Sequence, residues 1–242
     1  MFKYNRPLKE FDFFVDEDVR ARRVGILCME KHITAALTQA LFRVKENAMN
    51  FHCKKIESDE KMSQEEKREK LKHVNKQIKE VKWSNLNLMR SFIAQNFVQQ
   101  FFYYWSKGPL PIAFFNVPFI NDHVATINKA LPRIKELNID QMNQIHYSSS
   151  TLFLDSFTTP AKYKIEEKIR DSNNLSRCYR IDSRAHDLMQ LCDVLLGATT
   201  YQFENKKTNS RAKLDLIESF EKYRKYKKKH PYNYQSVYIF EN

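Results

Sequence analysis

Three acidic residues stand in apolar surroundings and could act together. Asp16 ends the run FDFFVD, Asp155 ends TLFLD, and Asp193 lies inside LMQLCDVLLGA. An unpaired carboxylate is costly to bury, so each needs a cation, a hydrogen-bond donor or a raised pKa. Carboxylates held together repel one another unless a divalent cation neutralises them, and oxygen ligands suit Mg²⁺ or Mn²⁺. A pair of such ions is a common device for cleaving phosphodiesters.

Each acid also has a purely structural explanation. An Asp at the end of a strand often forms a turn or caps a helix, which leaves the roles of Asp16 and Asp155 open. Asp193 is harder to explain in this way, because an Asp in the middle of a helix has no cap to make. On the same helix Gln190, Asp193 and Gly197 share one face, and Gly197 would let a substrate or another part of the chain come close.

Short apolar runs alternate with helical patterns along the chain. The first two runs, 11–16 and 24–29, are close enough to pair as a hairpin. Later runs predict strands at 112–117, 151–155, 178–181 and 236–240, and helical patterns begin near residue 31 and cover 86–105, 122–136, 186–204 and 208–229. We therefore expect an α/β fold in which a mixed sheet is flanked by helices, formed by a single domain over residues 1–242.

Residues 54–82 are densely charged in both signs. Within them Leu71, Val74, Ile78 and Val81 repeat at spacings of three, four and three, which is one helical stripe. This region is predicted to be a charged helical insertion that leaves the core of the domain. It offers a helix through which the chain could bind a protein partner or form a homo-oligomer.

The composition excludes several common site types. The chain has only three glycines, and no two are spaced to form a nucleotide-binding glycine loop. The histidines form no zinc-binding H-E-x-x-H pair, and there is no G-x-S-x-G of a serine hydrolase. Four cysteines without C-x-x-C spacing predict reduced thiols. The absence of a signal-peptide pattern and of a long apolar stretch predicts a soluble cytoplasmic protein that does not enter a membrane.

The chain is strongly basic, with 41 Lys and Arg against 29 Asp and Glu. Such a surface attracts polyanions, and nucleic acid is the commonest polyanion in a cell. The densest positive run is 222–230, where tyrosines alternate with cations and would suit phosphate contact with base stacking. A solvated helix end would explain the same run. Its cations that we assign to nucleic-acid binding are Arg224, Lys225, Lys227, Lys228 and Lys229.

The stretch IDSRAHDLMQLCDVLLGA over residues 181–198 resembles the C-terminal signature of the family called domain of unknown function 3800. That signature reads Asp-Ser-Lys/Arg, then Gln-Leu-Ala-Asp followed by apolar residues and Gly. The family also opens with a strand ending Asp-Glu-Ser-Gly, which corresponds here to VDED at 15–18. It carries a Glu-hydrophobic-Lys-Trp element, matched by residues 80–83, and a later strand that ends in Asp, matched by 152–155.

The resemblance implies a ribonuclease H-like fold and an acidic active site. Its catalytic metal ligands would be Asp16 on the first strand, Glu80 on a helix, Asp155 on the fourth strand and Asp193 on the last helix. They would hold Mg²⁺ or Mn²⁺, as two ions, while phosphates contact Lys82, Arg184 and the 222–230 run.

The function expected from this set is a metal-dependent phosphodiesterase, a nuclease acting on DNA or RNA. The alternative is a non-catalytic protein on a ribonuclease H-like fold that binds nucleic acid or a partner. Asp18, where the family has Ser, favours the alternative. Retention of all four acids favours the enzyme, because a site without function has no need to keep buried charge.

Overall fold

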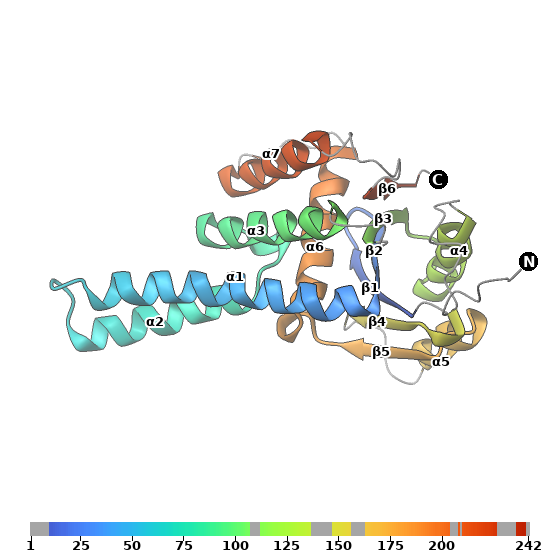
Figure 1. Cartoon of the computed structure of the whole chain (residues 1–242), viewed down its shortest axis with the longest axis horizontal. Helices are drawn as coiled ribbons and strands as arrows, with labels where there is room; N and C mark the ends of the chain where they lie inside the picture. Colours follow the sequence, from blue (N-terminus) through green and yellow to red (C-terminus); the bar gives the residue numbers. More distant parts are fainter. Residues whose placement is uncertain are drawn as a thin grey trace, which may run out of the picture.

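The computed structural model describes residues 10–106, 112–136, 147–155, 163–203, 208, 210–226 and 236–240. Within these residues the chain forms a mixed sheet between two layers of helices, as expected for an α/β fold (Figure 1). The sheet has six strands in the order β5-β4-β1-β2-β3-β6. The strands are β1 Phe11–Asp18, β2 Arg23–Glu30, β3 Ile112–Pro118, β4 Thr151–Asp155, β5 Arg177–Ile181 and β6 Val237–Ile239.

The sheet combines antiparallel and parallel pairing. Strands β1 and β2 pair antiparallel, with Phe11 opposite Glu30, so the predicted hairpin is confirmed. Strand β3 then pairs antiparallel with β2, whereas β4 pairs parallel with β1 and β5 parallel with β4. Parallel pairing of β1 and β4 brings their carboxyl ends to the same edge of the sheet, which is where both strands carry an Asp.

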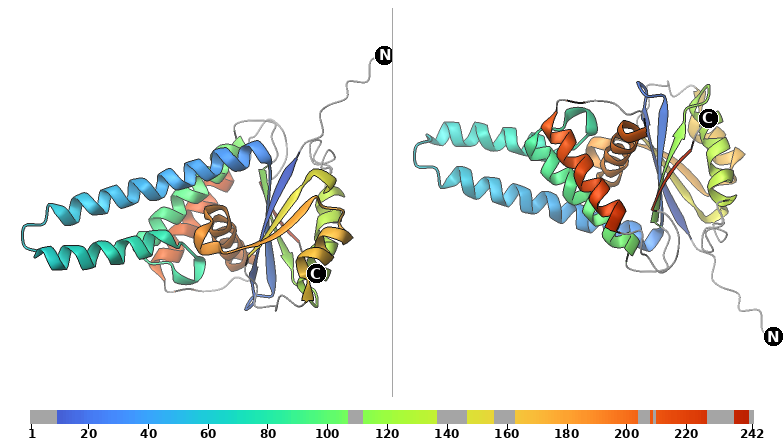
Figure 2. Two further views of the ribbon diagram at one scale, coloured as in Figure 1. Left: turned by 90° about the horizontal axis from the view of Figure 1, so that it is seen from below. Right: turned by 90° about the horizontal axis from the view of Figure 1, so that it is seen from above.

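Helices cover both faces of the sheet (Figure 2). Along β1, Phe14 packs into one hydrophobic core while Phe13 and Val15 pack into the other, as the alternation of side chains in a strand requires. The first core lies beneath α1, α3, α6 and α7, and the second beneath α4 and α5. The helices are α1 Lys31–Glu57, α2 Gln64–Lys79, α3 Leu88–Ser106, α4 His123–Glu136, α5 Ile165–Ser172, α6 Asp187–Phe203 and α7 Arg211–Tyr226, with short 3-10 turns η1 Trp83–Asn85, η3 Tyr147–Ser149 and η5 Ser183–Ala185.

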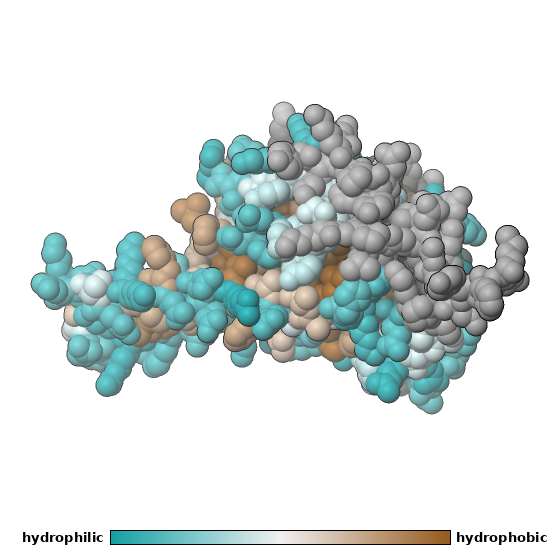
Figure 3. Space-filling view, in the orientation of Figure 1, coloured by the Kyte–Doolittle hydropathy of each residue, from teal (hydrophilic) through white to brown (hydrophobic). Residues whose placement is uncertain are grey.

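Helices α1 and α2 form a hairpin that projects from the domain (Figure 1). The turn into α2 is held by a capping box, in which Ser63 Oγ accepts from Glu66 N and Glu66 Oε2 accepts from Ser63 N. Residues 54–82 comprise the last turn of α1, all of α2 and the segment that leads back to the domain. The predicted stripe is buried at Val74, Ile78 and Val81. The far end of the hairpin is hydrophilic, while apolar side chains gather toward its base (Figure 3).

All four cysteines are free thiols, and Cys28 and Cys192 are fully buried. None of the described helices combines the length and the apolar character that crossing a bilayer requires.

Candidate functional site

Three acids from distant parts of the chain line one cavity. Val15 of β1 lies opposite Leu154 of β4, so Asp16 and Asp155 come next on two neighbouring strands. Helix α6 crosses the sheet over β1 and β2 and supplies Asp193. The cavity has a volume of about 680 Å³, and Asp18 also lines it. Asp155 is the last residue of β4, and Asp16 lies two residues before the end of the adjacent strand β1.

The electrostatic environment disfavours negative charge on two of these acids. Burial, with repulsion from Asp193 and Asp155, raises the pKa of Asp16 well above its ordinary value near 3.8. Burial also raises the pKa of Asp193 to about 6, although the N–H of Trp83 and the charge of Lys82 oppose the shift. Added positive charge would therefore stabilise the fully ionised cluster.

Backbone amides orient the three carboxylates. Asp16 Oδ1 accepts from the N–H of Glu17 at 2.8 Å, and Asp155 Oδ1 accepts from Ser183 N at 3.1 Å. Asp193 Oδ2 accepts from Trp83 N at 2.5 Å. These bonds fix one oxygen of each side chain.

Glu80 lies beside this group and is joined to it through a lysine. It follows the last residue of α2, and Lys82 Nζ lies 3.8 Å from Glu80 Oε1 and 4.0 Å from Asp155 Oδ2. Lys82 lines the cavity, and the lining residues do not include Glu80. The structure therefore brings Asp16, Asp155 and Asp193 together with Lys82 and places Glu80 at their margin.

The basic residues predicted to contact nucleic acid lie in different places. Arg184 is exposed on η5, where it pairs with Asp182, and its charge interacts with Asp155 and Glu80. Arg224 and Lys225 are exposed in the last turn of α7, about 17–18 Å along the helix from the cavity-lining Lys213, at a rise of about 1.5 Å per residue. Lys227, Lys228 and Lys229 lie outside the described residues.

One face of α6 holds the segment that follows α2. Gln190 Oε1 accepts from Val81 N at 2.9 Å, and its Nε2 donates to the carbonyl of Lys79 at 3.0 Å. Asp193 accepts from Trp83 N, one turn further along the same face. Gly197 follows, and a Cβ at that position would lie 2.1 Å from Trp83 Cγ. The shared face predicted for these three residues is therefore the surface on which 79–83 is docked, and Gly197 admits the Trp83 indole.

Lys45 of α1 completes this junction. Its Nζ donates to Asp187 Oδ1 at 2.6 Å, to Gln190 Oε1 at 2.8 Å and to the carbonyl of Lys79 at 2.9 Å. Burial lowers the pKa of this lysine, against the attraction of Asp187. Lys45 thereby connects the base of the hairpin to the helix that carries Asp193.

Several further residues line the cavity without a role assigned from the sequence, among them Trp83, Tyr201, Lys213 and Arg20. Trp83 belongs to the Glu-hydrophobic-Lys-Trp element. Gly197, in the middle of an apolar helix, was the sign in the sequence that another group packs closely against α6. Lys213 and Arg20 carried no such signal, because α7 and the β1–β2 turn reach the cavity only after folding.

The donor set suits a hard cation, although the described side chains are not arranged as a closed metal site. Among the described residues, no three His, Cys, Asp or Glu side chains are grouped closely enough to hold an ion. The available donors at the cavity are carboxylate oxygens, the type that Mg²⁺ and Mn²⁺ prefer, and Asp16 is only 4% exposed. Asp16, Asp155 and Asp193 supply these oxygens, and to share one ion they would have to lie closer together than they do here.

Comparison of the chain with protein-family models, with curated proteins and with solved structures found no match.

Proposed function

We propose that the protein is a metal-dependent phosphodiesterase, a nuclease, on a ribonuclease H-like fold. A fold of that kind opens with antiparallel strands and carries acids on the first strand, on the fourth strand and on the last helix of the active site. The antiparallel neighbours β1, β2 and β3 support this assignment, as do the positions of Asp16, Asp155 and Asp193.

The observation that carries the proposal is the convergence of Asp16, Asp155 and Asp193 on one cavity, with a raised pKa at Asp16 and Asp193. Each of these acids accepts one backbone N–H and Lys82 lies beside Asp155, yet Asp16 and Asp193 still have a raised pKa. Mg²⁺ or Mn²⁺ held by them would neutralise the cluster and polarise a phosphate group.

The chain's own groups have definite tasks in this scheme. Asp16, Asp155 and Asp193 supply ligand oxygens, each oriented by a backbone N–H. Lys82 lines the cavity beside Asp155, and its ammonium group can contact a phosphate oxygen. Gln190 holds the 79–83 segment in place and so positions both Lys82 and the amide that orients Asp193.

A second function is favoured by a specific observation. Lys82 Nζ already lies within 4.0 Å of Asp155 and 3.8 Å of Glu80, so an internal cation supplies part of the compensation. This arrangement supports the alternative of a protein that binds nucleic acid or a partner without turnover.

Cleavage assays separate the two functions. Labelled single-stranded and duplex DNA and RNA are incubated with the protein in Mn²⁺, Mg²⁺ or EDTA. We expect cleavage only with metal, and we expect Asp155→Asn and Asp193→Asn each to abolish it. The matched control is Asp171→Asn, which changes an exposed acid on α5 and should retain full activity.

Metal binding is measured in parallel by thermal melts. Mn²⁺ or Mg²⁺ at a concentration of about 100 times its Kd should raise the free energy of unfolding of the wild type by about 2.7 kcal/mol. The same ion should leave the melting temperature of Asp193→Asn unchanged. No cleavage and no metal-dependent shift, with nucleic-acid binding intact, would refute the nuclease and establish the alternative.

A further inference from the structure

The cavity also has an aromatic and basic part, which differs in chemistry from its acidic residues. Trp83 and Tyr201 line it, with ring centroids 6.1 Å apart and planes inclined by 54°. Lys213 of α7 reaches the same place, where its Nζ lies 4.9 Å from the centre of the Trp83 ring. One cavity therefore combines carboxylates with an indole, a phenol ring and a cation.

The Trp83 indole is held firmly. It packs directly on the α6 backbone at Gly197, and its own amide donates to Asp193. The contact with Gly197 and the hydrogen bond from the Trp83 amide to Asp193 thus hold the ring next to the acid cluster. A rigid aromatic ring beside a cation is the arrangement on which nucleobases stack in proteins that bind single strands.

We propose that this aromatic part of the cavity binds an unpaired nucleobase, so that the ligand is single-stranded DNA or RNA. The inference depends on the proposed function for the position of the scissile phosphate, and names the substrate class of that site. Inside a duplex both faces of each base are covered by neighbouring bases, and a terminal base stays paired to its partner strand, so an unpaired base is the one that fits against a ring inside a cavity of about 680 Å³. Lys213 covers the ring when no base is present, and moves to a phosphate oxygen when one binds.

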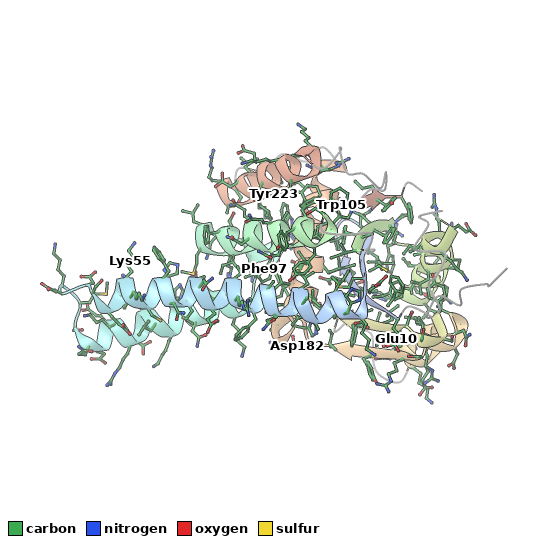
Figure 4. The ribbon with its side chains drawn as sticks, viewed as in Figure 1. Glu10, Lys55, Phe97, Trp105, Asp182 and Tyr223 are labelled. Atoms are coloured by element: carbon green, nitrogen blue, oxygen red, sulfur yellow. The ribbon has the colours of Figure 1, made fainter. Side chains whose placement is uncertain are left out.

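Tryptophan fluorescence tests this directly. The chain has two tryptophans, and Trp105, near the end of α3, is 2% exposed within the hydrophobic core (Figure 4). The difference in emission between the wild type and Trp83→Phe therefore reports Trp83. Eight-nucleotide single strands of DNA and RNA, and blunt duplexes of the same sequences, are titrated in EDTA and in Mn²⁺.

We expect single strands to quench Trp83 emission and duplexes to leave it unchanged. Trp83→Leu should weaken binding of single strands by about tenfold, while Trp83→Phe retains affinity within about threefold. Lys213→Gln should reduce the slope of log K against log salt by about 0.7, the value for one phosphate contact on a single strand. Phe92→Leu changes an aromatic residue that is 62% exposed on α3, outside this cavity, and should leave both measurements unchanged.

Equal quenching by duplexes, or no quenching by single strands in either condition, would overturn the inference. Thermal melts of each variant verify that it is folded, and Trp83→Phe keeps the test informative if Trp83→Leu unfolds. Quenching without cleavage would uphold the base site and refute the nuclease. Cleavage by an enzyme whose Trp83 emission never responds would uphold the nuclease and refute the base site.

Discussion

The contact between Trp83 and Gly197 makes a quantitative prediction for Gly197→Ala. In the middle of a helix, Ala is more stabilising than Gly by about 1 kcal/mol. At this position the new Cβ would lie 2.1 Å from Trp83 Cγ, 2.3 Å from Cδ2 and 2.6 Å from Cβ. Rotation of the ring cannot relieve the last contact, so the segment itself must move. Overpacking costs about 1–3 kcal/mol, and the severity of this overlap places it at the upper end.

We therefore expect Gly197→Ala to lower the free energy of unfolding by about 2 kcal/mol, which is about 3 for the overlap less about 1 for helix propensity. Trp83→Ala would keep the Cβ contact, whereas Trp83→Gly removes the whole overlap, so in a Trp83→Gly background the same change should instead stabilise by about 1 kcal/mol. The two values imply a coupling energy of about 3 kcal/mol. Urea unfolding of the four proteins, followed by circular dichroism, measures it. Stabilisation by Gly197→Ala in the wild type, or an equal effect in both backgrounds, would refute the packing described for this face of α6.

Three further predictions concern charged residues. Because the pKa of Asp193 is about 6 in the folded protein and near 3.8 when unfolded, its ionisation destabilises the metal-free fold as pH rises from about 4 to above 6. The difference between these two pKa values corresponds to about 3 kcal/mol. Asp193→Asn should therefore raise the free energy of unfolding by up to that amount at pH 7.5 in EDTA and by little at pH 4, as measured by urea unfolding. A lower free energy of unfolding at pH 7.5 would show that Asp193 is a structural acceptor. Lys45→Met leaves the partly buried Asp187 without its lysine and should lower the free energy of unfolding by about 2–3 kcal/mol. The control Lys72→Met breaks an exposed pair on α2 and should change the free energy of unfolding by less than about 0.5 kcal/mol. Equal losses would show that the Lys45 junction stabilises the fold no more than an exposed ion pair does. Changing Lys227, Lys228 and Lys229 to Gln should weaken nucleic-acid binding equally for all sequences and flatten its salt dependence, and an unchanged salt slope would exclude phosphate contacts there.

Much of the fold was predictable from local patterns. Apolar runs located the six described strands to within a few residues, and β1, β2 and β3, which are buried along nearly their whole length, gave the longest of these runs. The stripe ending at Val81 identified the buried face of α2, and the short link between the first two runs identified the hairpin. The ends of β1 and β4 were recognisable as candidate sites because Asp is out of place after an apolar run.

The length of α1 could not be read from the 54–82 charge pattern alone. The charged segment begins at residue 54, whereas the helix starts at Lys31 and ends at Glu57. Its buried residues change partners along its length, from the sheet to α2 and α3, so one helix spans two environments. Composition marks where solvent exposure begins, and backbone hydrogen bonding decides where the helix ends.

Local patterns are enough to show that acids end two apolar runs and interrupt one apolar helix, because burial and charge conflict at single positions. Which of these acids meet depends on how the strands and helices pack. Strand register set Asp16 beside Asp155, and the packing of α6 added Asp193, whereas the turn after α2 left Glu80 outside the cavity lining. Gly197, inside an apolar helix, indicated that another group packs closely against it. That group is Trp83, which is more than one hundred residues away in the chain. Such contacts depend on how whole elements pack, and no local pattern specifies that.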